Sequence, residues 1–110
     1  MKVKLEAQKT TIRLSKDEFQ SLLDIGSLSE QTTFPGGKSL SFKIELDMEQ
    51  YFSFKDNEML FVLPNQLLHA YRPSKSGLAF KFHVDSNQTH QLVFEVDIKK
   101  PPLGAATKGN

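Results

Sequence analysis

Apolar and polar residues alternate along most of the chain, and this pattern predicts strands with one buried face. The first strand is expected from residue 2, and a change in the parity of its apolar positions predicts a bulge or bend at residues 8–10. Two hairpins are expected next. Residues 28–34 and 39–47 flank a Pro-Gly-Gly-Lys turn, and residues 51–54 and 59–63 flank a polar turn.

Two helices interrupt the strands. Ser15 and Glu18 are spaced as a capping box, and Gly26 suits a left-handed helix end, so a helix is expected over residues 16–25. Pro64 is expected to start a second, shorter helix, which Pro73 and Gly77 would end. A last hairpin follows, with apolar faces over residues 78–84 and 92–98.

The two halves of the chain resemble each other in element order and spacing, which predicts an internal repeat of residues 1–48 and 50–99. Five apolar positions of the first half recur 49 residues later. These are Val3, Leu5, Ile12, Leu14 and Phe19, matched by Phe52, Phe54, Phe61, Leu63 and Leu68. The last strand of each half was matched by aligning Phe42 with Phe94. The expected fold is α+β, a curved antiparallel sheet or open barrel with two helices packed on it.

Length and composition restrict the class of protein and leave the predicted fold unchanged. A chain of 110 residues fits one domain, expected over residues 1–100, and the Pro, Gly, Ala and Thr content of residues 101–110 predicts a disordered tail. The chain has no cysteine, which excludes disulfides and thiolate chemistry. Its formal net charge of +1 gives no overall electrostatic field that would attract nucleic acid or anionic membranes. A cytoplasmic bacterial protein is expected, since no segment reads as a signal peptide or a membrane span.

Comparison of the halves singles out two polar residues. If Phe34 pairs opposite Leu40, then Glu30 and Thr32 share the apolar face of their hairpin, at positions where the second half has phenylalanines. A buried carboxylate needs a partner, and the candidates are Arg13 or a hydroxyl such as Thr11 or Thr33. Arg13, Glu30 and Thr32 therefore form a candidate ligand or anion site. The alternative explanations of Glu30 are a one-residue register slip, which would put it in water, and an edge strand that uses charge against aggregation.

Other chemical motifs are weak. His83, Asp85 and His90 flank one turn without the spacing of a metal site, and His69 reads as a surface group, so no metal or cofactor is expected. No nucleophile-elbow pattern accompanies the serines, so no catalytic residues are assigned. Acidic residues interrupt the positive charges of the first strands, and no aromatic residues interleave with them, so nucleic-acid binding is the weakest hypothesis. These charges are Lys2, Lys4, Lys9, Arg13 and Lys16.

Two segments resemble a family of short uncharacterised bacterial proteins, a domain of unknown function. The first is the helix start Ile12-Arg13-Leu14-Ser15-Lys16-Asp17-Glu18, and the second is the Glu-x-Thr-x-Phe strand over residues 30–34. The resemblance implies no activity. It departs at the C-terminus, where the family tends to continue with a Cys and an acidic tail that this chain lacks.

The function is therefore left open by the sequence. The leading hypothesis is a small non-catalytic binding or protein-interaction module that acts through a sheet face or edge. Its partner would be another protein or a second copy of the chain paired through a sheet edge. The alternative is a small-molecule or anion pocket around Arg13, Glu30 and Thr32, which could be catalytic.

Overall fold

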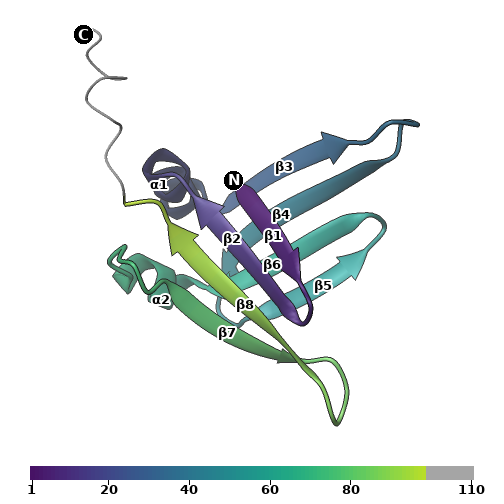
Figure 1. Cartoon of the computed structure of the whole chain (residues 1–110). Coiled ribbons are helices and arrows are strands. Elements are labelled where there is room, and N and C mark those ends of the chain that lie inside the picture. The colour runs from purple at the N-terminus through teal and green to yellow at the C-terminus, as the bar shows by residue number, and fades with distance from the viewer. Residues whose placement is uncertain (99–110) are drawn as a thin grey trace, which may run out of the picture.

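The computed structural model describes residues 1–98 of the chain, which form eight strands and two helices (Figure 1). In chain order the elements are β1 (Lys2–Glu6), β2 (Lys9–Leu14), α1 (Lys16–Ile25), β3 (Ser27–Thr33), β4 (Ser39–Asp47), β5 (Tyr51–Lys55), β6 (Glu58–Pro64), α2 (Asn65–Ala70), β7 (Leu78–His83) and β8 (Thr89–Val96). The α+β class and the two helices are thus confirmed. The predicted tail of residues 101–110 lies outside the described residues.

The strands form two four-stranded sheets rather than one. Sheet A has the order β1-β2-β8-β7, and sheet B has the order β3-β4-β6-β5. The outer pairs of each sheet are antiparallel, but the central pairs β2–β8 and β4–β6 are parallel. The prediction of a single antiparallel sheet is therefore wrong, because alternation along a strand does not report the direction of its neighbour.

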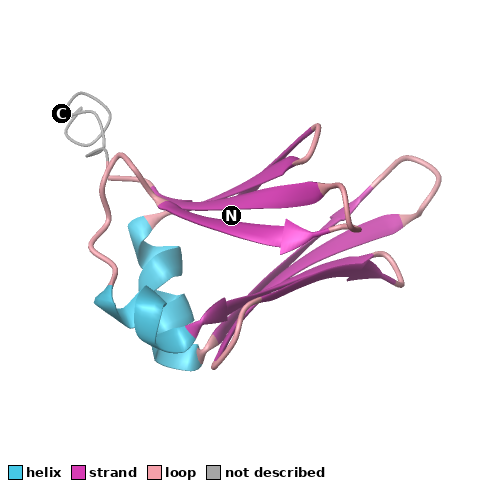
Figure 2. Cartoon of the chain, turned by 90° about the horizontal axis from the view of Figure 1, so that it is seen from below, coloured by secondary structure: helices cyan, strands magenta, loops and turns pink. Residues whose placement is uncertain are grey.

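Each sheet combines strands from the two halves of the chain. The hairpin β1–β2 joins β7–β8 in sheet A, and the hairpins β3–β4 and β5–β6 make up sheet B. Each helix carries the chain from one sheet to the other, because α1 links β2 to β3 and α2 links β6 to β7. Figure 2 shows the two sheets as separate layers, with both helices together at one end.

Local signals explain where α1 begins and ends. The Ser15 hydroxyl accepts a hydrogen bond from the backbone N–H of Glu18, and the Glu18 carboxylate accepts one from the backbone N–H of Ser15. Gly26 ends the helix with φ of 90°, a conformation that favours glycine. Phe19 and Leu22 are the buried residues of the helix. The predicted helix of residues 16–25 is confirmed at both ends.

Three predictions about single elements need correction. The parity change near residue 8 marks a tight hairpin turn between β1 and β2, in which Gln8 has φ of 58°, and not a bulge within one strand. The second helix ends at Ala70, before Pro73. The last strand ends at Val96 rather than at residue 98.

The residue pairings of the two halves correspond. Val3 pairs with Ile12 in sheet A, and Phe52 pairs with Phe61 in sheet B. Across the parallel centres, Ile12 pairs with Phe94, and Phe61 pairs with Ile44. Ile44 therefore matches Phe94 in position. The sequence comparison had aligned Phe42 with Phe94, which is two residues away from this register.

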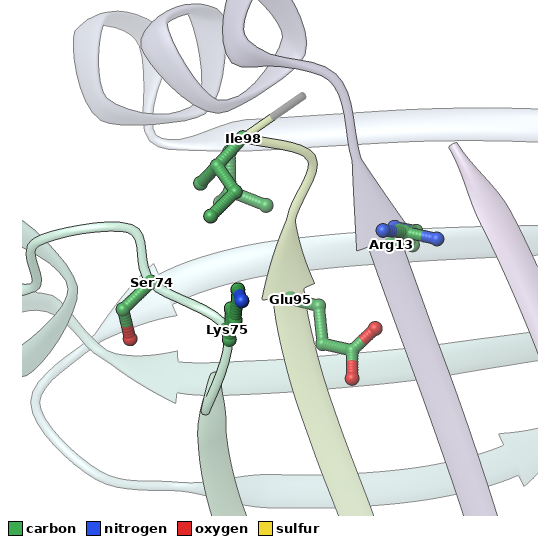
Figure 3. Close-up of a pocket in the computed structure, with 6 residues that line it drawn as sticks. Arg13, Ser74, Lys75, Glu95 and Ile98 are labelled. Carbon is green, nitrogen blue, oxygen red and sulfur yellow. The ribbon is translucent and has the colours of Figure 1, made fainter. Parts of the chain in front are cut away.

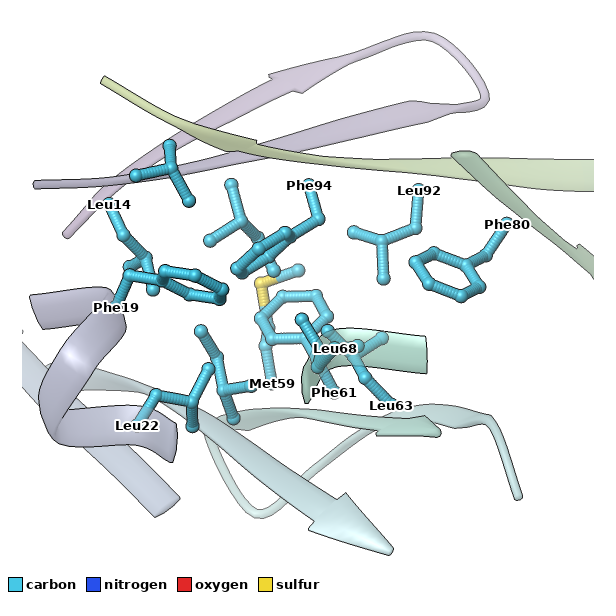
Figure 4. Close-up of a cluster of buried hydrophobic side chains, with 13 residues drawn as sticks. Leu14, Phe19, Leu22, Met59, Phe61, Leu63, Leu68, Phe80, Leu92 and Phe94 are labelled. Carbon is cyan, nitrogen blue, oxygen red and sulfur yellow. The ribbon is translucent and has the colours of Figure 1, made fainter. Parts of the chain in front are cut away.

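The inner faces of the two sheets enclose the core together with the helices (Figure 4). Its fully buried members come from the four central strands and both helices. The largest are Phe61, Phe94, Ile12, Leu14, Leu22 and Ile44. The burial of these apolar side chains between the two sheets is the main force that stabilises the fold. Among the described residues, no helix has the length and apolar character needed to cross a membrane.

We expect Phe61→Ala to lower the free energy of unfolding by about 3–5 kcal/mol, because Phe61 is fully buried at the centre of sheet B. Urea unfolding followed by circular dichroism measures this loss. Phe34→Ala is the control, because Phe34 is 50% exposed at the β3–β4 turn and should lose far less. Similar losses in both variants would contradict the assignment of the core.

Candidate functional site

The register of β3 and β4 decides where Glu30 and Thr32 lie. Thr32 pairs with Leu40 and Glu30 pairs with Phe42, so the predicted pairing of Phe34 with Leu40 is wrong by two residues. A shift of two keeps the same face, and Glu30 and Thr32 do lie on the inner face of sheet B with Leu40 and Phe42. Both are nevertheless exposed, because β3 is the edge strand of its sheet.

Arg13 does not meet Glu30. It lies between the buried residues Ile12 and Leu14 on β2, so its side chain points to the outer face of sheet A. The Glu30 carboxylate instead lies 3.5 Å from the N-terminal ammonium of Met1, which also contacts Glu18. The hydroxyl of Thr33 pairs with that of Ser39. The three residues predicted as one site, Arg13, Glu30 and Thr32, are thus not brought together.

Glu18 links the first strand to the helix start. Partial burial of its carboxylate raises its pKa, but hydrogen bonds from the N-terminal ammonium and from the backbone and hydroxyl of Ser15 outweigh this, and the net pKa lies below its ordinary value of 4.5. The ionised carboxylate therefore stabilises the folded chain.

Because the pKa of Glu18 is lower in the folded chain, this stabilisation is present above a pH of about 4.5 and is lost as the pH falls through the folded pKa. We expect Glu18→Gln to cost less than about 1 kcal/mol near neutral pH and almost nothing in acid. Urea unfolding at neutral and at acid pH tests this expectation, and Glu49→Gln, which changes an exposed carboxylate, is the control. A difference that grows in acid would contradict the prediction.

The outer face of sheet A carries a shallow hollow beside Arg13, with a volume of about 410 Å³ (Figure 3). Arg13 and Lys75 line it together with Glu95, and Arg13 also lies 4.0 Å from Asp97. Carboxylates accompany both cations, so the hollow does not present the concentrated positive charge that an anion would need. The lysines of β1 lie on the same face, and Glu6 interrupts them there.

The histidines differ in their surroundings. His69, His83 and Asp85 are exposed, and the Asp85 carboxylate accepts a hydrogen bond from the backbone N–H of Asn87 within the β7–β8 turn. Within residues 1–98, no group of three or more potential ligands is placed to hold a metal ion. His90 is half-buried and faces the space between the sheets.

That space is an apolar cleft of about 470 Å³ between the two sheets. It lies where the central strands begin, at the opposite end of these strands from the helices. Its apolar lining comes from both sheets: Leu5, Leu40, Phe52, Phe54 and Met59. Two of these residues, Leu5 and Phe54, are 57% and 64% exposed, so apolar surface is presented to solvent at the cleft.

Three polar residues complete the lining, Glu6, Thr10 and His90, and the last two form a pair. The Thr10 hydroxyl, in a side chain that is fully buried, lies 2.8 Å from Nε2 of His90. The His90 ring also meets the Phe52 ring edge-on, with centroids 5.3 Å apart. The neutral imidazole has one donor and one acceptor nitrogen, so the nitrogen that does not face Thr10 keeps its own hydrogen-bonding capacity.

The register correspondence shows how unusual this pair is. Ile12 and Phe94 match Phe61 and Ile44, so Thr10 matches Met59 and His90 matches Leu40. Sheet B has a thioether and an aliphatic chain at these positions, and sheet A has a hydroxyl and an imidazole. Sequence reasoning missed this pair because its alignment of the last strands was shifted, and His90 was grouped with the surface residues His83 and Asp85.

Comparison with known proteins yields one match. A protein-family model described as a family of unknown function (DUF7009) matches residues 1–100. No curated protein and no solved structure matches the chain. The resemblance expected from the helix start and the β3 segment is confirmed at the level of the family.

Proposed function

The chain belongs to the DUF7009 family of unknown function, and we propose that it is a non-catalytic binding module whose cleft between the sheets takes a small apolar molecule with one hydrogen-bonding group. The observation that carries the proposal is the hydrogen-bonded pair of Thr10 and His90 among the apolar residues of this cleft. Small-molecule sites combine a mainly apolar lining with a few placed polar groups in the same way.

The size and exposure of the cleft support a small ligand. A volume of about 470 Å³ lies within the range of ligand sites in proteins. Leu5 and Phe54 expose apolar surface that a ligand would cover, and covering such surface is favourable. The ligand would place its apolar part against these two residues and its polar group toward His90.

Binding rather than catalysis is favoured by the burial of Thr10. A hydroxyl beside an imidazole is the start of a nucleophile and base pair, but a nucleophile must reach its substrate. The Thr10 side chain is fully buried, so its hydroxyl positions His90 and is withheld from attack. A bacterial, cytoplasmic setting belongs to the same proposal, and so does an origin of the two halves by duplication, which their matching pairings support.

The absence of tryptophan from the chain makes a direct binding test possible. We expect 1-octanol to cause a saturable blue shift in the emission of Phe54→Trp, because the ligand would shield the new indole from water. Tyr51→Trp is the matched control. Tyr51 lies on the same strand, is 55% exposed and points to the opposite face. No shift in Phe54→Trp, or equal shifts in both variants, would contradict a small-molecule cleft and would leave a protein segment as its occupant.

A second variant measures the contribution of the apolar lining. In the Phe54→Trp background, Leu5→Ala should weaken 1-octanol binding about fivefold, because it removes roughly 1 kcal/mol of apolar contact. Leu67→Ala is the control, since Leu67 is partly exposed on α2, away from the cleft. An equal effect of the two substitutions would show that the alcohol acts on the whole fold.

A further inference from the structure

We propose that the free edge of β3 pairs with β3 of a second copy of the chain, in an antiparallel register centred on Gln31, and so joins the two B sheets in a symmetric dimer. This inference is independent of the ligand cleft. It starts from a comparison of the four strands that form sheet edges, β1 and β7 in sheet A and β3 and β5 in sheet B.

Three of these edges carry features that oppose pairing with another strand. β1 has Lys4 at its centre, and β5 ends in Lys55. β7 has Lys81, whose backbone carbonyl accepts a hydrogen bond from the Gln50 side chain. Lysine on an edge strand is a common protection against association, because an incoming strand must desolvate or approach its charge.

β3 has no lysine at its edge. It is the longest of the four edge strands, and it contains neither lysine, arginine nor proline. Its one charged residue, Glu30, lies on the inner face, and its carboxylate is 3.5 Å from the N-terminal ammonium of Met1. Its residues from Ser29 to Thr33 are all exposed. A long edge strand of this kind presents free backbone groups to a pairing partner.

The hydrogen bonding of the hairpin identifies which backbone groups are free. The N–H of Phe34 donates to the carbonyl of Lys38, toward the β4 side. Backbone groups alternate along an antiparallel strand, so those of Thr32 and Glu30 also point toward β4. The N–H and C=O groups of Ser29, Gln31 and Thr33 therefore point to the open edge.

A symmetric register centred on Gln31 satisfies both the backbone and the side chains over the exposed residues Ser29 to Thr33. It sets Gln31 opposite its own copy and Ser29 opposite Thr33, so the outward-pointing groups of these three residues meet partners. It also sets Glu30 opposite Thr32, a carboxylate beside a hydroxyl. A register centred on Glu30 would bring two like charges together, which is unfavourable.

This register also explains the residues that break the correspondence between the halves. Leu28 pairs with Ile44 as Leu78 pairs with Phe94, so Glu30 and Thr32 match Phe80 and Phe82 of β7. Phe80 is buried and Phe82 packs on Phe52, inside one copy. In β3 the same two positions are exposed and complement each other across the proposed dimer axis.

Proline substitutions separate the dimer from the fold of one copy. We expect sedimentation velocity of the full chain to show a monomer–dimer equilibrium that shifts with concentration. Gln31→Pro should leave the monomer folded, because the lost N–H points away from β4, but weaken dimerisation roughly thirtyfold through two lost hydrogen bonds. Thr32→Pro is the contrasting variant, which should destabilise the monomer, since its N–H bonds to β4.

A cross-link tests the register itself. The chain has no cysteine, so Gln31→Cys introduces a single thiol at the proposed axis, where paired Cα atoms lie at a distance compatible with a disulfide. Oxidation should give a covalent dimer, whereas Lys4→Cys at the centre of the β1 edge should stay monomeric. A monomer at every concentration, a dimer unaffected by Gln31→Pro, or equal cross-linking of the two cysteine variants would overturn the proposal.

Discussion

Parallel pairing between strands that do not directly follow one another in the chain is the constraint on which the rest of the structure depends. β2 lies beside β8, and β4 lies beside β6, so that neither half of the chain completes a sheet of its own. The helices follow directly from this arrangement, because each must carry the chain from one sheet to the other. Both lie at the same end of the layers, and the cleft is left at the other end, where the central strands begin.

The features that local chemistry determines could be predicted from the sequence. The limits of α1 depend on the Ser15–Glu18 capping box and on Gly26, all within one short segment. The hairpins β3–β4 and β5–β6 are likewise marked by their turns. The parallel centres could not be predicted, because a strand with one buried face looks the same whether its neighbour runs parallel or antiparallel. The change of parity near Gln8 was ambiguous for a related reason, since a bulge and a tight turn both shift the alternation.

The candidate site also has features that could be predicted from the sequence and features that could not. Glu30 stood out in the sequence because a carboxylate on an apolar face is costly, and its face was predicted correctly. Its exposure depends on β3 being an edge strand, which is a property of the whole sheet. Thr10 and His90 lie 80 positions apart, and only the pairing of β2 with β8 brings them together. Their counterparts Met59 and Leu40 identify them as an exception, but only after the strands are aligned by register.

The order in which strands enter sheet A has a consequence for the synthesis of the chain. The hairpin β1–β2 is made first, but β2 acquires its parallel neighbour only when β8 has been translated. Until then, the side of β2 that faces β8 has no native strand neighbour, although Ile12 is already paired with Val3 of β1. Non-local pairing of this kind delays folding and exposes unpaired strands to aggregation. The strands of sheet B are consecutive, so all of them are made before β8, whereas sheet A cannot be complete until β8 has been translated.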